Sequence, residues 1–258
     1  MHSIIIPHRD RNAYLEQCLW SIERSARECE VEDYEVVVVD DYSKTPVASP
    51  DRVTVVGIAK CPTSPFNKPL LQNIGIEKSS GEILTFLDAD AIVPTRWFDC
   101  AAILSRLGSN AITKLCYRVR SLPVKALTWL QYAGEARGEL IDEWFDNYDA
   151  YPKAFEGYGE AHTNGDEGTP VFGNSQFSIL RECLGTTRFN EEYKGRGFED
   201  LWLNRELWRR DKKNYRAEIV TAEDYALLHL TQPGGGSEEW GAGKYNDANY
   251  KRYFESNQ

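Results

Sequence analysis

The sequence predicts an α/β protein with a mostly parallel central sheet flanked by helices. Over residues 3–90 the apolar patterns follow the order strand, helix, strand, strand, helix, strand, which is typical of a doubly wound parallel sheet. Polar clusters directly follow three of these strands. The chain has 258 residues, of which 41% are hydrophobic and 12% aromatic, so its length and composition suit one globular α/β domain or two closely packed halves.

The first strand and the first helix are indicated by two different apolar patterns. Residues 3–6 form a short apolar run that ends at Pro7, which predicts a buried strand. Apolar residues then recur at three- and four-residue spacing, which predicts an amphipathic helix. These residues are Leu15, Leu19, Ile22 and Ala26.

Two more strands, a second helix and a fourth strand follow along the chain. Residues 35–39 form a β-branched run, which predicts a buried parallel strand, and residues 53–58 predict a third strand. An apolar stripe within residues 70–74 predicts the second helix. Residues 83–87 predict the fourth strand, which completes the first half of the sheet.

The second half of the chain is less regular. The predicted elements are helices over residues 97–107, 126–144 and 201–210, and a strand over residues 171–179. Residues 156–170 are rich in glycine and acidic residues, which predicts an exposed loop. Glycines on both sides of Trp240 predict a hinged flap over residues 234–243.

Polar residues gather where three of the predicted parallel strands end. Ligands of parallel α/β sheets bind beyond the carboxyl ends of the strands, so these residues are expected to line one site. The clusters are Pro7-His8, Asp40-Asp41 and Asp88-Ala89-Asp90.

The charge balance disfavours a nucleic-acid binder. The formal net charge is −10, and a surface this acidic repels phosphate backbones. One basic group is the exception, and its simplest interpretation is the solvated face of a helix over residues 205–216. Its members are Arg205, Arg209, Arg210, Lys212, Lys213 and Arg216.

The cysteines and the apolar runs indicate in which cellular compartment the protein is expected. The six cysteines form no C-x-x-C pair and no spacing typical of a zinc site. The first residues lack the basic region of a signal peptide, and the longest apolar runs have only the length of strands. We therefore expect reduced cysteines in a cytoplasmic protein, although a piece of a secreted or membrane-tethered enzyme would have the same pattern.

Asp88 and Asp90 are candidate ligands of a divalent cation. Mg²⁺ and Mn²⁺ prefer carboxylate and phosphate oxygens in octahedral geometry. Two carboxylates on a turn after a buried strand can offer one direct ligand and one that acts through water or a sugar hydroxyl. A D-x-D tripeptide is otherwise common as a solvated turn, and its position at the end of the strand over residues 83–87 favours the metal site.

Glu199 and Asp200 are candidates for acid–base chemistry. A sugar hydroxyl is a weak nucleophile and needs a base, and the dipole at a helix N-terminus keeps a carboxylate ionised for that role. Gly195 and Gly197, just before the pair, indicate close approach of the backbone to another group. The alternative is an ordinary helix start with acidic residues in its first turn.

His229 and Lys68 complete the set of candidates. Imidazole is a ligand of Mn²⁺ as well as Zn²⁺, but His229 lies in an apolar run, where a buried core histidine is the alternative. Lys68 precedes the second predicted helix and is placed to face a phosphate, with an ordinary solvated lysine as the alternative.

Five blocks in the same order resemble the β-1,4-galactosyltransferase family. In that family they read I-I-P-F-R-x-R, F-N-R-A-x-L-L-N-x-G, D-x-D, F-G-G and G-W-G-G-E-D. In this chain the similar blocks lie at residues 4–11, 66–75, 86–90, 171–174 and 195–200. Bacterial chondroitin-type polymerases and polypeptide N-acetylgalactosaminyltransferases share them more loosely, and residues 84–90 look equally like the family-2 glycosyltransferases.

The resemblance implies the GT-A fold, the Rossmann-like fold of nucleotide-diphospho-sugar transferases. It also implies one compact domain with two halves: residues 1–95 bind the nucleotide-sugar, and residues 96–258 bind the acceptor and carry the catalytic base. The spacing from Asp200 to His229 suits the family's C-terminal metal histidine.

The same resemblance implies a role for each matching residue. Contacts to the uridine, the diphosphate or the donor sugar are implied for Pro7, Arg9, Arg11, Asp40, Phe66, Lys68 and Asp88. Metal ligation is implied for Asp90 and His229, with Asp88 in support. Asp200 would be the general base, and Glu199 would hold hydroxyls of the acceptor or donor.

Several positions depart from the family pattern. Arg196 stands where the galactosyltransferases carry a tryptophan, and Phe198 replaces a glycine. Ala226 lies where a metal-binding methionine is common, and Lys68 replaces an arginine. These changes surround the sugar pocket, so they put the identity of both donor and acceptor in doubt more than the metal or the base.

Together the patterns predict an inverting glycosyltransferase that uses Mn²⁺ or Mg²⁺. It would move a hexose or N-acetylhexosamine from a UDP-sugar to a hydroxyl, most simply on a glycan. Modified DNA or protein is an alternative acceptor. A nucleotidyltransferase is a further alternative, against which the absence of glycine from residues 7–10 counts. A non-catalytic binding module is another, and the intact carboxylates count against it.

Overall fold

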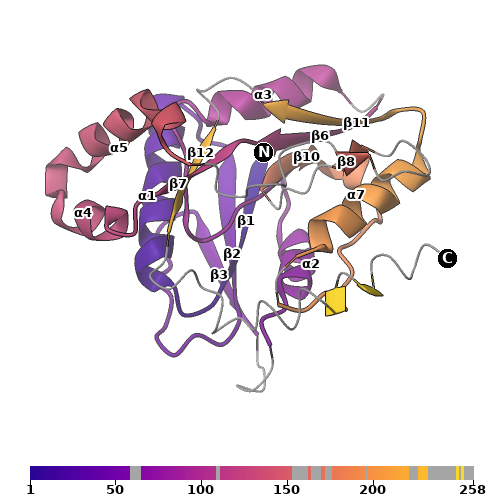
Figure 1. The fold of residues 1–258 in the computed structure, drawn as a ribbon, viewed down its shortest axis with the longest axis horizontal. Helices are drawn as coiled ribbons and strands as arrows, with labels where there is room; N and C mark the ends of the chain where they lie inside the picture. The colour runs from indigo at the N-terminus through magenta and orange to yellow at the C-terminus, as the bar shows by residue number, and fades with distance from the viewer. Residues whose placement is uncertain are drawn as a thin grey trace.

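The computed structural model describes residues 1–58, 65–108, 111–152, 162–163, 170–171, 176–195, 197–220, 226–231, 248–249 and 251–252. Within these residues, helices cover both faces of a central seven-stranded sheet (Figure 1). The helices α1, α4 and α5 gather at one end of the molecule, and α2 and α7 lie at the other.

The central sheet is mostly parallel. Its strands, in spatial order, are β11 (Tyr215–Val220), β6 (Ile112–Tyr117), β10 (Phe177–Leu180), β4 (Ile83–Phe86), β1 (His2–His8), β2 (Tyr34–Asp40) and β3 (Val53–Gly57). The neighbours pair in parallel, except that β10 runs antiparallel to both β4 and β6. The predicted fold class is therefore confirmed, and strands from residues 1–95 and from residues 96–258 share one sheet.

Two smaller sheets complete the described strands. One contains β5 (Ala91–Ile92), β12 (Leu227–Leu230) and β7 (Val119–Leu122), and the other pairs β8 (His162–Thr163) with β9 (Pro170–Val171). Because β5 directly follows Asp90 and β12 contains His229, the first of these sheets joins two distant segments of the chain beside the predicted site.

The helices largely follow the predicted ranges. They are α1 (Asn12–Glu28), α2 (Lys68–Lys78), α3 (Phe98–Leu107), α4 (Ala126–Tyr132), α5 (Arg137–Asp146), α6 (Arg181–Leu184) and α7 (Glu199–Arg210), with the 3₁₀ turns η1 (Gly134–Ala136) and η2 (Tyr148–Ala150). The four strands predicted before residue 90 are all present.

Successive side chains along each strand point to opposite faces of the sheet, and helices pack against both faces. Val36 and Val38 belong to the large core that also contains the apolar stripe of α1, whereas Val37 and Val39 pack with Leu71 of α2. Gly75 of α2 lies so close to β1 that an added Cβ would come within 2.3 Å of an Ile5 side-chain carbon. Glycine at this position therefore allows α2 to lie directly against the sheet.

Two predictions of local structure are wrong, and a third element starts earlier than predicted. The helix predicted over residues 126–144 is interrupted, because Gly134, the first residue of η1, adopts a φ of +56°. The helix predicted from residue 201 begins two residues earlier, so Glu199 and Asp200 lie inside its first turn. The basic helix predicted over residues 205–216 ends at Arg210, and Arg205 is buried instead of facing solvent.

Some predicted segments are only partly described. The strand predicted over residues 171–179 appears as the end of β9 and most of β10, and residues 172–175 lie outside the described residues. So do the predicted flap over residues 234–243 and most of the predicted loop over residues 156–170. Five of the cysteines are described, and all five are free thiols. In the described part of the chain, none of the helices combines the length and the hydropathy that crossing a bilayer requires.

His2 is a buried histidine in the core. Its ring stacks on Trp97 and meets Phe98 edge-on, with centroid distances of 5.6 and 5.4 Å, and its Nε2 lies 2.6 Å from the Thr85 hydroxyl. Burial, assisted by the positive charge of the N-terminus, lowers the pKa of His2 to about 3. The folded state therefore holds this ring in its neutral form at neutral pH.

We expect acid to destabilise the fold through His2. In the unfolded chain the ring takes up a proton near pH 6.5, while in the folded chain it does so near pH 3, so stability is lost as the pH falls between these values. From pH 7 to pH 5 the loss from this group is about 2 kcal/mol. Urea unfolding of the wild type and of His2→Gln at both pH values measures it. The variant is expected to be less stable at pH 7 but to lose less on acidification; equal losses in both proteins would contradict the assignment.

Candidate active site

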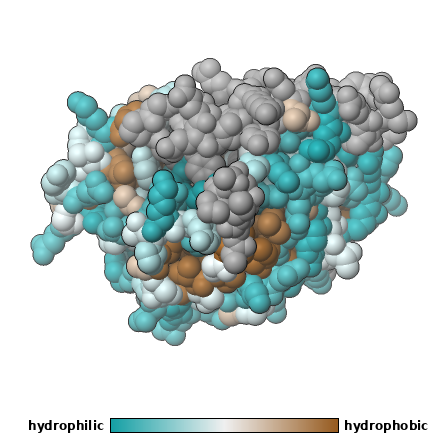
Figure 2. Space-filling model, turned by 90° about the horizontal axis from the view of Figure 1, so that it is seen from below, coloured by the Kyte–Doolittle hydropathy of each residue, from teal (hydrophilic) through white to brown (hydrophobic). Residues whose placement is uncertain are grey.

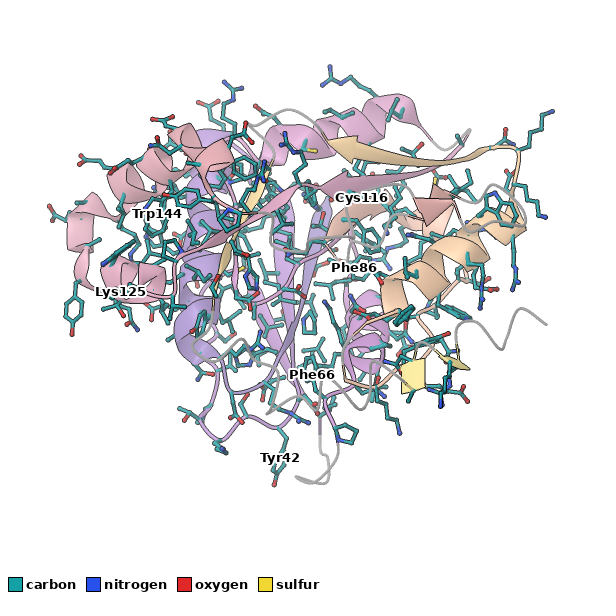
Figure 3. All side chains as sticks on the ribbon, in the orientation of Figure 1. Tyr42, Phe66, Phe86, Cys116, Lys125 and Trp144 are labelled. Atoms are coloured by element: carbon teal, nitrogen blue, oxygen red, sulfur yellow. The ribbon has the colours of Figure 1, made fainter. Side chains whose placement is uncertain are left out.

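The predicted site residues meet at the edge of the sheet where β1, β2 and β4 end. His8 and Asp40 are the last residues of β1 and β2 and are paired in register. Asp88 follows β4, which runs parallel to β1. Figure 3 shows this edge at the bottom of the molecule, marked by Phe66 and Tyr42, and Figure 2 shows the same edge face-on.

Asp40 is held by a local hydrogen-bond network. The backbone N–H of Arg11 donates to His8 Nε2 at 3.2 Å, so the ring proton lies on Nδ1, which donates to Asp40 Oδ1 at 2.8 Å. The hydroxyl and the backbone N–H of Ser43 also donate to this carboxylate, at 2.5 and 3.1 Å. Asp40 is thus oriented from two strands, with its charge partly exposed at the edge of the sheet.

Arg9 and Phe66 form a second feature of this edge. Arg9 donates to Asp41 Oδ2 at 2.6 Å and to the Asp41 carbonyl at 3.1 Å, and its guanidinium lies 5.6 Å from the centroid of the Phe66 ring. Phe66 and Ile58 are partly buried against the core beneath α2. Figure 2 shows hydrophobic surface gathered on this face within a hydrophilic border. Pro7 is buried inside β1, opposite Val39.

Lys68 lies between the two pairs of acidic residues. It is the first residue of α2, whose N-cap Asn67 accepts from the Leu70 N–H at 3.2 Å. Its ammonium contacts Asp88 Oδ1 and lies 3.9 Å from Glu199 Oε1. Burial alone would lower the pKa of Lys68, but Asp88 and Glu199 outweigh burial and raise it. Lys68 therefore stays positively charged where two carboxylates converge.

Asp90 is buried, with 2% of its surface exposed. Arg11 Nη1 lies 2.8 Å and His229 Nε2 lies 3.3 Å from its Oδ2. Burial would raise the pKa of Asp90, but His229, Arg11 and Lys68 together lower it. Burial lowers the pKa of His229, but Asp90 and Asp88 together outweigh burial and raise it. The two side chains thus form a charged pair.

The donors at this point suit a hard or borderline divalent cation. Asp90 offers carboxylate oxygen, and His229 offers imidazole nitrogen from β12, whose register pairs it with Ala91. Asp88 is close but contacts Lys68. Among the described residues, no three His, Cys, Asp or Glu side chains form a complete metal cluster. Asp90 and His229 therefore fit a site whose remaining ligands come from a phosphate-bearing substrate and water.

Glu199 and Asp200 are buried at the start of α7. They are 6% and 9% exposed, and Phe198 before them adopts a left-handed conformation with a φ of +72°. Burial and the neighbouring Asp200 raise the pKa of Glu199 to about 7. Burial also raises the pKa of Asp200, and Lys114 opposes this increase. Lys68 lowers the pKa of both carboxyls, and Lys114 is the larger influence on Asp200.

Sequence reasoning missed several residues that shape this site. Asp41, which is fully buried, anchors Arg9, and His8 orients Asp40; both were visible as part of the polar clusters but had no assigned role. Lys114, inside β6, is not among the residues predicted for the site. Its signal was a single charge within the otherwise apolar run of residues 112–117. Arg196, which departs from the family pattern, lies outside the described residues.

Comparison with known proteins agrees with the fold. Residues 3–99 match the family model "Glycosyl transferase family 2". No curated protein matches the chain. Among solved structures, the chain is similar to S. aureus TarS 1–349, with 16% identity and a TM-score of 0.54, covering 97% of this chain and 65% of that one.

Two other solved structures carry ligands in their descriptions. The mannosyltransferase PcManGT from Pyrobaculum calidifontis, in complex with GDP-Man and Mn²⁺, has 18% identity and a TM-score of 0.58, covering 98% of this chain and 64% of that one. S. aureus TarS 1–349 in complex with UDP-GlcNAc has 15% identity and a TM-score of 0.52, covering 97% of this chain and 66% of that one. This chain therefore spans less than two thirds of the length of these structures and shares their fold.

Proposed function

We propose that this chain, which has the GT-A fold and matches the family 2 glycosyltransferase model over residues 3–99, transfers a hexose or N-acetylhexosamine from a UDP-sugar to a hydroxyl of a glycan. The observation that carries the proposal is the meeting of Asp88 and Glu199 at Lys68, beside the pair of Asp90 and His229. In this geometry, positive charges that can bind a diphosphate lie next to carboxylates that can accept hydrogen bonds from a hydroxyl.

The donor would bind across the edge of the sheet. Arg9 and Phe66, with the apolar surface around them, suit a uracil ring, and the oriented Asp40 carboxylate suits the N–H of the base or the hydroxyls of the ribose. Pro7 lies near the end of β1, and Arg9 and Arg11 follow that strand. Lys68 and Arg11 would balance the charge of the diphosphate, and Asp88 would accept hydrogen bonds from the donor sugar.

A divalent cation, Mn²⁺ or Mg²⁺, would be held by Asp90 and His229 together with phosphate oxygens, with Asp88 in support. When bound, such a cation stabilises negative charge on a departing diphosphate. The complex of PcManGT with GDP-Man and Mn²⁺ supports this choice of ion by analogy of fold. Arg11 and Lys68 contribute positive charge to the same region from the protein itself.

The reaction proposed for the carboxyls of Glu199 and Asp200 is a single in-line displacement. Asp200 takes the proton of the acceptor hydroxyl as its oxygen bonds to the anomeric carbon, and the bond from that carbon to the diphosphate oxygen breaks, which inverts the anomeric centre. Glu199, with its pKa near 7, can both donate and accept hydrogen bonds with sugar hydroxyls. In this scheme residues 1–95 bind the donor and residues 96–258 supply the base and the acceptor surface.

A thermal-shift screen tests the proposal directly. UDP-glucose, UDP-galactose and their N-acetylated forms, with GDP-mannose as a comparison, would each be tested with and without Mn²⁺. The expected result is a rise in melting temperature for at least one UDP-sugar that requires the metal, since a ligand that binds the folded state raises its midpoint. Release of UDP with oligosaccharide acceptors then distinguishes a transferase from a binding module. Absence of any metal-dependent shift would reject the donor class.

A further inference from the structure

A lysine inside the sheet lies behind the proposed catalytic base. Lys114, in the middle of β6, has no exposed surface. Its ammonium donates to Asn204 Oδ1 at 2.7 Å and lies 4.0 Å from the centroid of the Phe177 ring. Burying an ammonium is costly unless anions and hydrogen-bond acceptors surround it, so a charge kept at this position calls for an explanation.

The hydrogen bond to Asn204 places this ammonium against the face of α7 that also carries Asp200. Asn204 comes four residues after Asp200, so the two side chains lie on the same face of the helix. Asn204 also accepts from the Tyr215 hydroxyl at 3.3 Å, which anchors this face of α7 to β11. Figure 3 marks the same part of the sheet at Cys116, two residues beyond Lys114 on β6.

The charged and titratable groups around Asp200 come from three elements. They are Lys114 and Cys116 on β6, Lys68 on α2 and Glu199 on α7 itself. Burial favours the neutral carboxyl of Asp200, and Lys114 and Lys68 oppose this by lowering its pKa. The effect of Lys114 is the larger of the two, and Lys68 also contacts Asp88 and Glu199.

We propose that Lys114 is a positioning residue whose buried ammonium keeps the Asp200 carboxylate ionised and directed for proton abstraction, a role that rests on the proposed assignment of Asp200 as the base. Asn204 holds the ammonium in place, and the face of the Phe177 ring stabilises its charge. The lysine acts through Asp200 and touches neither substrate.

The experiment titrates Asp200 without needing a substrate. Protein labelled with carbon-13 in the aspartate carboxyls is titrated by NMR, and the Asp200 signal is identified by its loss in Asp200→Asn. In Lys114→Met the midpoint of Asp200 is expected to rise by about one pH unit or more, and in Lys114→Arg it should stay near the wild-type value. Lys125→Met, at the exposed start of α4, is the matched control and should leave the midpoint unchanged.

A second variant covers the case in which Lys114→Met does not fold. Asn204→Asp adds a carboxylate beside the same ammonium, so it should also raise the midpoint of Asp200. Unchanged midpoints in folded Lys114→Met or in Asn204→Asp would overturn the inference.

The kinetic readout separates this inference from the proposed function. With a UDP-sugar from the screen and oligosaccharide acceptors, Lys114→Met should lower kcat about tenfold at pH 6, keep the KM for the donor, and recover as the pH rises. If Asp200→Asn keeps full activity, the base assignment itself fails. If Asp200→Asn is inactive while Lys114→Met has the wild-type pH profile, only the role of Lys114 fails.

Discussion

Asp200→Asn is expected to lower kcat by about a thousandfold or more while leaving the affinity for the UDP-sugar within about threefold of the wild type. Asparagine has nearly the same shape as aspartate but cannot take a proton from the acceptor hydroxyl. The residues proposed to contact the donor lie on other elements: Arg9 and Arg11 after β1, and Lys68 on α2. Calorimetry for binding and UDP release for turnover measure the two quantities separately.

A matched control for this substitution is available in α3. Asp99 also lies in the first turn of a helix, where it pairs with Arg96 at the surface, so Asp99→Asn makes the same chemical change away from the proposed site. It should keep both binding and turnover. Because burial raises the pKa of Asp200, replacing it should not weaken the fold, and a folded variant with wild-type turnover would show that another group is the base.

Asp90→Ala is expected to remove metal-dependent UDP binding, with affinity in the presence of Mn²⁺ lowered by about a hundredfold or more. Asp90 would supply the carboxylate of the metal pair, and His229 alone would be a weak ligand. Without metal, the same variant should bind UDP as well as the wild type or better, because a buried negative charge near the diphosphate has been removed. Calorimetry with and without Mn²⁺ tests both expectations.

Two further variants serve as controls for the Asp90→Ala prediction. Asp90→Asn preserves the size of the side chain and should show the same loss of metal dependence if the alanine variant is unstable. Asp149→Ala removes an exposed aspartate that pairs with Arg118 and Arg120, and it should leave UDP binding unchanged. Metal-stimulated UDP binding by a folded Asp90 variant at the wild-type level would show that the cation is held elsewhere.

The first half of the fold could be predicted from the sequence because its signals are local. The β-branched run of residues 35–39 and the apolar spacing of α1 depend on neighbours within a few positions, and each becomes an element at nearly the predicted bounds. The position of Asp40 and Asp88 at one edge of the sheet could be predicted from these strands, because parallel strands end at a common edge.

The second half could be predicted less well, because its strands obtain their stability from distant partners. The strand β6 contains a charged residue, Lys114, which hides its apolar character in the sequence. The strand β12 is only Leu227–Leu230 and exists through pairing with β5 and β7. The interruption between α4 and α5 depends on the backbone of Gly134, for which the helical spacing of its neighbours gave no warning.

The types of residue in the candidate site were set by the sequence alone: two acidic pairs, a lysine before a helix and a histidine in an apolar run. Their partners were decided only by tertiary structure. Pairing of β12 with β5 brings His229 to Asp90, and the docking of α2 beside α7 puts Lys68 between Asp88 and Glu199. The physical reason is that charge interactions act through space, so which cation lowers the pKa of each carboxyl depends on packing between segments that lie far apart in the sequence.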